Sequence, residues 1–287
     1  MSQRQARTLA GKVVAITGGG RGIGAATAAA LRSRGARVAI GDIDDVVGKE
    51  TAARLGLEWY GHVDVTDEES FGEFVRQVEA EVGPLDVLIN NAGIMPVGPL
   101  MDEDARTARR VIDINVLGVI TGTKLAIGSM AARRSGHIIN LASMAGVAAV
   151  PGLATYNASK FAVVGFTDAV RLEVRPMGID VTSVLPYFVN TELAEGTTGP
   201  RGFNKAEPEE VAAAIVDALE HPVPRVYVPR GTGRLVRLFR KFPQALTERL
   251  NTAMGGDRIF LDDVDHRARA AYERRARDVE DDGERSS

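Results

Sequence analysis

Short runs of β-branched residues alternate with longer helix-like windows through the first two-thirds of the chain. A short apolar run fits a buried strand, and apolar positions three and four residues apart fit a helix. The predicted strands are 12–17, 37–40, 57–63, 85–89, 137–141, 179–185 and 225–228. The predicted helices are 23–34, 68–82, 105–133, 155–175 and 208–220. This alternation requires crossover connections and predicts an α/β fold with a mostly parallel, doubly wound, seven-stranded sheet.

The composition changes after Gly233, where arginine and aspartate become more frequent and strand-like runs stop. We therefore expect a polar tail over residues 1–10, one domain over 11–233 and a helical extension over 234–287 with a frayed end. Residues 267–277 alternate charge with alanine and predict a solvent-exposed helix. Residues 234–242 place apolar and basic side chains on adjacent helical stripes, which favours packing on the core or on a second subunit over binding to an anionic membrane.

The charge balance and the absence of cysteine narrow the possible functions. The chain has 35 basic and 38 acidic residues, so its surface as a whole is not built to bind nucleic acid. Without cysteine it can form no disulfide, thiolate zinc site or iron–sulfur centre, and its 4 histidines show no ligand spacing, so no metal is expected. No signal peptide is recognisable, and no run approaches the roughly 20 apolar residues of a membrane span. We expect a cytoplasmic protein without membrane association.

A glycine-rich turn directly follows the first predicted strand and opens the first predicted helix. Glycines let the backbone approach a pyrophosphate, and the free N–H groups of a helix N-terminus attract its charge. The glycine spacing differs from the G-x-G-x-x-G fingerprint, but the context predicts a dinucleotide-binding turn. The alternative is that the glycines serve only tight packing of helix on strand. The residues expected to bind the dinucleotide here are Gly18, Gly20, Arg21, Gly22, Ile23 and Gly24.

Asp42 ends the second predicted strand. A carboxylate there can accept hydrogen bonds from both ribose hydroxyls of NAD and repels the additional phosphate of NADP. Aspartate also favours helix N-caps, and both roles are compatible. Arg21 instead favours binding of NADP, because a cation in the glycine turn can reach a 2′-phosphate. An arginine can turn into solvent, however, so NAD is favoured over NADP.

Tyr156 and Lys160 lie four residues apart at the start of a predicted helix and therefore share one of its faces. An unperturbed tyrosine titrates near ~10, too high for a base at neutral pH, and a neighbouring ammonium lowers that pKa. Ser143 follows the predicted strand 137–141, at the sheet edge where such folds bind ligands. Each pattern is weak alone, since chance Tyr-x-x-x-Lys matches are frequent and Ser143 fits a turn or cap equally well.

Together these residues resemble the short-chain dehydrogenase/reductase family over about residues 12–231, with the motifs in the family's order. The resemblance implies a single Rossmann-type domain. Besides the glycine turn, the matching positions are Asp64 and Val65 after the third strand, Asn91, Ala92 and Gly93 after the fourth, Asn115 within a helix, and the set Ser143, Tyr156 and Lys160.

The resemblance implies hydride transfer between a nicotinamide and a carbonyl or secondary alcohol. Tyr156 is then expected to exchange the proton with the substrate oxygen, and Ser143 to hydrogen-bond that oxygen. Lys160 is expected to lower the pKa of the tyrosine and to bind the nicotinamide ribose. Asn115 is expected to hold a water that links Lys160 to solvent.

One stretch departs from the family pattern, because Tyr187 follows Pro186 where the family usually has glycine. Tyrosine removes backbone freedom and adds bulk near the expected nicotinamide site. The resemblance implies cofactor contacts at Pro186, Val189 and Thr191. Because of Tyr187, the sequence does not determine the course of the backbone to Val189 and Thr191. Residues 193–205 predict a mobile lid.

Apolar side chains fall in the loops that the resemblance places around the substrate: Met95, Pro96, Met144, Val150, Pro151, Tyr187 and Phe188. If they line the pocket, the substrate is apolar and lipid-, steroid- or terpenoid-like; alternatively, half of them belong to the ordinary core. The leading function is an NAD-dependent oxidoreductase. The alternatives are an NADPH-dependent 3-oxoacyl-carrier ketone reductase and a non-catalytic dinucleotide-binding sensor or scaffold. The resemblance also implies a homo-oligomer, a dimer or tetramer, formed by two long helices across a twofold axis.

Overall fold

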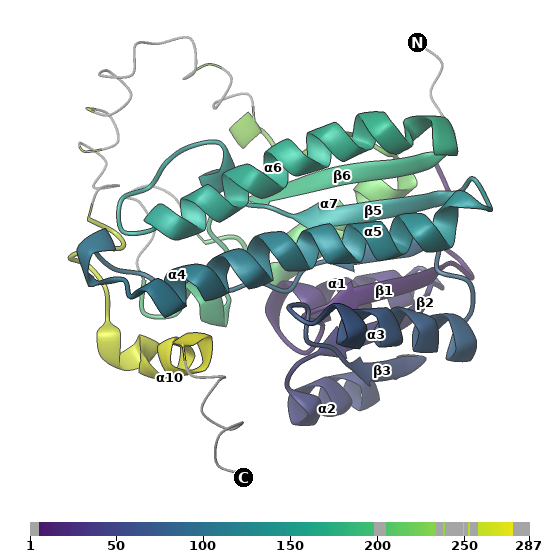
Figure 1. Ribbon diagram of the computed structural model, residues 1–287, viewed down its shortest axis with the longest axis horizontal. Coiled ribbons are helices and arrows are strands. Elements are labelled where there is room, and N and C mark those ends of the chain that lie inside the picture. The colour runs from purple at the N-terminus through teal and green to yellow at the C-terminus, as the bar shows by residue number, and fades with distance from the viewer. Residues whose placement is uncertain are drawn as a thin grey trace.

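A seven-stranded sheet forms the centre of the computed structural model (Figure 1). The structure describes residues 6–197, 205–233 and 258–277 and the single positions 238, 249 and 252. Its strand order is β3-β2-β1-β4-β5-β6-β7, and all neighbouring strands are parallel. The strands are β1 Val13–Thr17, β2 Arg37–Asp42, β3 Trp59–His62, β4 Val87–Asn90, β5 Gly136–Leu141, β6 Ile179–Pro186 and β7 Arg225–Val228. The predicted α/β fold with a doubly wound parallel sheet is confirmed.

Helices cover both faces of the sheet, so its central strands are buried on two sides (Figure 1). One face carries α1 Gly22–Ser33, α2 Asp45–Leu55 and α7 Pro208–Glu220, and the other carries α3 Glu68–Glu81, α5 Gly118–Ala131 and α6 Ala154–Val174. Successive residues of β1 supply the two cores alternately: Val14 and Ile16 pack on the α1 side, Val13 and Ala15 on the α3 side.

Local sequence signals set several helix ends. Helix α7 begins with Pro208, and Glu207 and Glu210 cap it reciprocally. Helix α2 ends at Gly56, which has a left-handed φ of 57°. This helix was not among the predicted ones, because its buried residues, Gly48, Thr51 and Ala52, give no apolar periodicity.

The longest helical unit runs from Ala105 to Ala131 and consists of α4 Ala105–Ile112, a π-helical segment Asp113–Leu117 and α5. By length and composition it is apolar enough to cross a membrane, so the expectation that no stretch approaches such a span is wrong. In this structure α5 packs on β4 and β5 and against α3, while α4 packs against α6.

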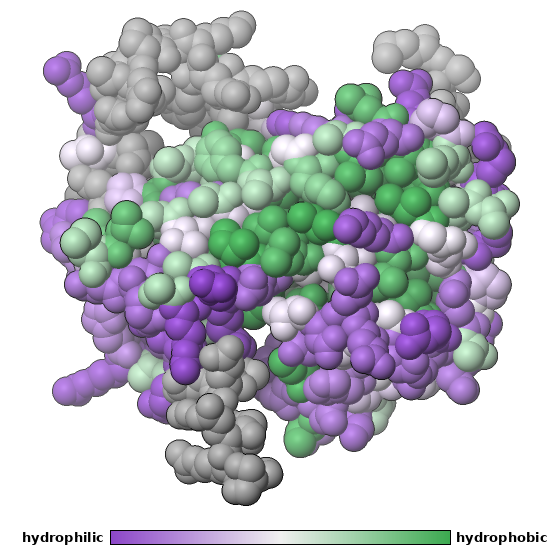
Figure 2. Space-filling model, viewed as in Figure 1, coloured by the Kyte–Doolittle hydropathy of each residue, from purple (hydrophilic) through white to green (hydrophobic). Residues whose placement is uncertain are grey.

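A broad apolar surface covers the face formed by α5 and α6, as Figure 2 shows. Leu117, Phe161 and Leu172 are large apolar residues that are about half exposed or more, at 49%, 47% and 61%. Contiguous apolar surface of this kind marks interaction sites in proteins that are otherwise polar outside.

Two chain ends pack more closely than the sequence predicts. In the predicted tail, Leu9 is buried and Arg7 forms an ion pair with Asp180 at 2.6 Å. At the other end, helix α10 His266–Arg277 lies beside α4 and buries Arg269, Tyr272 and Ala276. The prediction of a solvent-exposed helix over 267–277 is therefore wrong for the face of α10 that carries these three buried residues. Except for Leu238, the stripe over 234–242 lies outside the described residues, as do 198–204 of the predicted lid and the predicted frayed end 278–287.

Candidate active site

The carboxyl ends of the central strands open onto a cavity of about 660 Å³, the place where parallel sheets commonly bind ligands. Three of the predicted site residues, Gly20, Gly24 and Asn115, do not line it. The predicted residues that do are Gly18, Arg21, Gly22, Ile23, Asp42, Asp64, Val65, Asn91, Ala92, Gly93, Ser143, Tyr156, Lys160, Pro186, Val189 and Thr191. Among the residues that the structure describes, no group of three His, Asp or Glu side chains could hold a metal ion.

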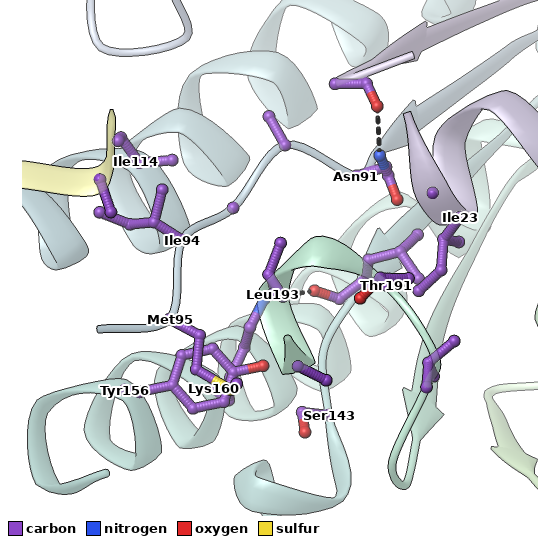
Figure 3. A pocket seen from close by; sticks show the side chains of 18 of the residues that line it. Ile23, Asn91, Ile94, Met95, Ile114, Ser143, Tyr156, Lys160, Thr191 and Leu193 are labelled. Atoms are coloured by element: carbon purple, nitrogen blue, oxygen red, sulfur yellow. Dashed lines mark hydrogen bonds between the residues drawn. The ribbon is translucent and has the colours of Figure 1, made fainter. Parts of the chain in front are cut away.

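The glycine turn between β1 and α1 is too tight for side chains. A Cβ on Gly18, whose φ is 63°, would lie 2.9 Å from the Cα of Ala92, and one on Gly24 would lie 2.2 Å from the carbonyl oxygen of Gly18. Asn91 holds the turn in place, because its Nδ2 donates to the carbonyl oxygens of Thr17 at 3.0 Å and Gly18 at 2.9 Å (Figure 3). Gly24 thus serves close packing, while Gly18 also faces the cavity.

Asp42 faces the same turn from the end of β2. Its carboxylate accepts hydrogen bonds from the backbone N–H of Gly20 at 2.8 Å and of Asp44 at 3.1 Å, and the residue is 9% exposed. Asp44, not Asp42, caps α2, since its side chain accepts from the N–H of Val47. The carboxylate of Asp42 is therefore fixed at the cavity rim without serving as a helix cap.

Arg21 is bound to acidic side chains and is not free to turn into solvent. Its guanidinium donates to Asp44 at 2.6 Å and pairs with Glu192 at 3.6 Å. Burial raises the pKa of Asp44, but hydrogen bonds from Arg21 and from the N–H of Val47 outweigh it and leave the pKa below its usual range. Arg275 also pairs with Glu192, at 2.7 Å, so two guanidinium groups face the three carboxylates of Asp42, Asp44 and Glu192 at this rim.

Tyr156, Lys160 and Ser143 meet at the other end of the cavity, where α6 begins beside the end of β5 (Figure 3). Ser143 accepts a hydrogen bond from the N–H of Ala145 at 3.1 Å and so caps a short 3₁₀ turn, Met144–Gly146. Ser143 also lines the cavity together with Tyr156. Both interpretations of Ser143, cap and active-site hydroxyl, are therefore compatible.

The pKa of Tyr156 differs from the expectation. Burial raises it to about 12, against a smaller lowering by the hydrogen bond with Ser143. Lys160 was expected to lower this pKa, but its Nζ lies 5.6 Å from the ring centroid and donates to the carbonyl oxygen of Leu141 at 2.9 Å. Burial therefore dominates, and the phenol is neutral at pH 7.

Lys160 keeps its proton at neutral pH, because burial lowers its pKa only to about 8. Beside it, a Cβ on Gly93 would lie 3.6 Å from Nζ and 3.1 Å from the Oδ1 of Asn115. Asn115 is fully buried, and its side-chain amide bonds both backbone groups of Ile94 at 2.9 Å and Ser159 Oγ at 3.1 Å. That amide therefore positions the loop after β4. The predicted water site at Asn115 stays a prediction.

Tyr187 is accommodated without backbone strain. Among the described non-glycine residues, only Arg134 has a positive φ. Val189 pairs with Ala206 in an isolated bridge, and Thr191 reaches the glycine turn, where its Cγ2 would lie 3.2 Å from a Cβ on Gly22. Val189 and Thr191 both line the cavity despite Tyr187, which lines it as well.

The substrate end of the cavity contains residues that the sequence did not indicate. Of the seven apolar loop residues, Pro96 and Pro151 do not line the cavity, whereas the other five do. The unpredicted lining residues include Ile94, Arg110, Ile114, Leu193, Ile259, Phe260, Tyr272, Arg275 and Ala276. The last five lie in the chain's final thirty residues, and no local pattern connects them with the sheet edge.

Comparison with known proteins agrees with this geometry. The family model described as short chain dehydrogenase matches residues 12–201. A protein of Mycobacterium tuberculosis named 3-alpha-(or 20-beta)-hydroxysteroid dehydrogenase is 37% identical over 215 residues, which is 72% of this chain and 82% of that protein. The probable oxidoreductase EphD of the same species is 35% identical over 259 residues, 82% of this chain. The chain spans only 44% of the length of EphD.

A solved structure shares the architecture as well. The short chain dehydrogenase/reductase of Burkholderia phymatum, in complex with NAD, superposes with a TM-score of 0.75 and 26% identity, covering 82% of this chain and 95% of that one. From the fold, the arrangement at the sheet edge and the matched family model, we conclude that this chain belongs to the short chain dehydrogenase family.

Proposed function

We propose that the protein transfers hydride between NAD(H) and an apolar secondary alcohol or ketone. The observation that carries the proposal is the shared cavity, which has Asp42 and the glycine turn at one end and Tyr156, Lys160 and Ser143 at the other. A cavity of about 660 Å³ lies within the usual size of ligand pockets.

The residues at the sheet edge fit a dinucleotide. The cavity wall lacks side chains at Gly18, Gly22 and Gly93, so the backbone is accessible there. The remaining residues proposed to hold the cofactor are Arg21, Ile23, Asp42, Asp64, Val65, Asn91, Ala92, Tyr156, Lys160, Pro186, Val189 and Thr191. Gly20 and Gly24 are proposed to act indirectly, by shaping the glycine turn. When bound, the nicotinamide supplies the hydride or accepts it.

Tyr156 Oη is the proposed proton donor to a ketone oxygen. With a pKa of about 12 the phenol carries its proton at pH 7, the form needed for reduction. Ser143 lines the same end of the cavity and supplies a hydroxyl for the same oxygen. The Lys160 ammonium adds positive charge that favours the phenolate once the proton has left.

The rim supports NAD rather than NADP. A 2′-phosphate would meet the fixed carboxylate of Asp42, and Arg21 could bind it only by leaving Asp44 and Glu192. The apolar wall supports a bulky hydrophobic substrate, because Met95, Phe188 and Phe260 belong to one buried cluster with Tyr156. The name of the hydroxysteroid dehydrogenase relative points the same way.

The test is turnover with paired cofactors and probes: NADH or NADPH with progesterone, and the same cofactors with acetoacetyl-CoA. The proposal predicts that NADH with progesterone is the best pair. Preference for NADPH with the thioester would establish the acyl-carrier reductase instead. Cofactor binding without turnover on any secondary alcohol or ketone would favour the non-catalytic sensor.

The apolar surface over α5 and α6 supports a second part of the proposal, a homo-oligomer formed through these helices. Leu117, Phe161 and Leu172 lie exposed on them or at their start, where a second copy of the chain would remove them from water.

A further inference from the structure

Helix α10 closes the substrate end of the cavity, although it belongs to the predicted extension and not to the sheet domain. In Figure 1 it lies below α4, at the end of the molecule away from β3. Its residues Tyr272, Arg275 and Ala276 line the cavity, as do Ile259 and Phe260 just before it. Phe260 packs edge-on against Phe188, with ring centroids 6.0 Å apart.

Arg269 of α10 is a fully buried cation with 0% exposure. Its guanidinium donates to the carbonyl oxygens of Leu193 at 2.6 Å and Glu195 at 3.0 Å, and to that of Met95. Its Nε also donates to Glu273 at 2.6 Å. These three carbonyls come from two loops far apart in sequence, the loop after β4 and the loop after β6, so one side chain connects both loops to α10.

Tyr272 provides a second hydrogen bond between α10 and the backbone of Met95. The backbone N–H of Met95 donates to the Tyr272 hydroxyl at 2.7 Å, while the guanidinium of Arg269 stacks over the Tyr272 ring at 4.7 Å. Both backbone groups of Met95 are thus bound to α10. Met95 and Tyr156 belong to the same buried cluster and line the same end of the cavity (Figure 3), so α10 holds the backbone of a residue that lies near the proposed proton donor.

A buried guanidinium is costly to desolvate, and an apolar side chain would pack a helix on this surface at lower cost. Its rigid fork of donors can serve several carbonyls at once, which the single ammonium of lysine cannot do in the same geometry. The cost is therefore consistent with a requirement that the two loops keep fixed positions relative to Tyr156.

We propose that α10 forms the outer wall of the substrate pocket and that Arg269 is a positioning residue, which fixes the Met95 and Leu193–Glu195 loops over bulky apolar substrates. This inference rests on the proposed function. Because these loops lie at the substrate end, loss of Arg269 should affect bulky substrates far more than NADH.

The test compares Arg269→Met and Arg269→Lys with Arg274→Met, a matched control at an exposed position of the same helix. The KM and kcat for progesterone and for cyclohexanone are measured with NADH, together with the Kd of NADH. For both Arg269 variants we expect the progesterone KM to rise at least about tenfold, since small misplacements at a pocket are costly. The cyclohexanone KM and the Kd of NADH should stay within about twofold, and the control should behave like the wild type.

A second readout does not depend on turnover. Amide hydrogen exchange in segments 94–97 and 193–197 should accelerate at least about tenfold in Arg269→Met and not in the control. If Arg269→Met fails to fold, Tyr272→Phe replaces it and should accelerate exchange at Met95 and raise the progesterone KM. Unchanged exchange together with unchanged progesterone KM would overturn the inference, even if thermal stability fell. A wild type that turns over neither ketone would instead refute the proposed function, and the exchange data would still decide whether Arg269 fixes the two loops.

Discussion

Replacing Asp42 with asparagine tests the cofactor preference at a single atom. Asparagine keeps the size of the side chain and one acceptor oxygen for the N–H of Gly20 or Asp44, so the turn can hold its shape. It removes the negative charge at a residue that is 9% exposed. A hydrogen bond to a charged acceptor is worth about 1.5–3 kcal/mol. We therefore expect NADH to bind about 10- to 150-fold more weakly.

The same change should help NADPH, because the repulsion between the carboxylate and a 2′-phosphate disappears. Two charges ~4 Å apart interact by about 1 kcal/mol in water and about 4 kcal/mol near a protein surface. The assay is a fluorescence titration of NADH and NADPH at fixed ionic strength, with Asp45→Asn as the control, since Asp45 is exposed and does not line the cavity. A ratio of the two Kd values that stays within about twofold of the wild type would refute the role of Asp42.

Three further predictions use other parts of the structure. Gly93→Ala should lower kcat at least about tenfold, because a Cβ would lie 3.1 Å from the Oδ1 of Asn115 and 3.6 Å from Lys160 Nζ, while the Kd of NADH measures any effect on binding. Burial lowers the pKa of His137 from 6.5 to about 4, so its contribution to stability is present above pH 6.5 and lost as the pH falls toward 4. Between pH 7 and pH 4, the free energy of unfolding of His137→Gln should fall by about 3 kcal/mol less than that of the wild type, as measured by urea unfolding. Equal decreases in the two proteins would contradict this assignment. Leu172→Glu should reduce the mass measured by light scattering to that of a monomer, whereas Leu100→Glu, at the same 61% exposure, should not.

The sheet and the cofactor end of the site could be predicted because their signals are local. Most strands, such as β1 and β4, show as short buried runs, and the turn after β1 requires glycine for reasons that lie within a few residues. The position of Ser143, Tyr156 and Lys160 at one sheet edge follows from the parallel topology alone. Helix α2 gave no such signal, because it buries small residues.

The substrate end could not be predicted, because it depends on contacts between distant parts of the chain. Arg269 lies in a window that alternates charge with alanine, and only its three carbonyl partners explain why it is buried. The pKa of Tyr156 was misjudged for a related reason: the sequence shows the neighbouring Lys160 but not the depth of burial. Burial is set by the whole fold, and here it raises the pKa of Tyr156 more than the hydrogen bond with Ser143 lowers it.

The most direct test of the account is the rate of NADH oxidation with progesterone by the wild type and by Tyr156→Phe, with the Kd of NADH measured on the same preparations. The variant loses only the Oη of a residue that is 7% exposed, so folding and cofactor binding should be retained. General acid catalysis contributes about 10²–10⁴-fold, and we expect kcat to fall within that range with the Kd unchanged. A variant that binds NADH normally and turns over within about fivefold of the wild type would contradict the assignment of Tyr156 as the proton donor.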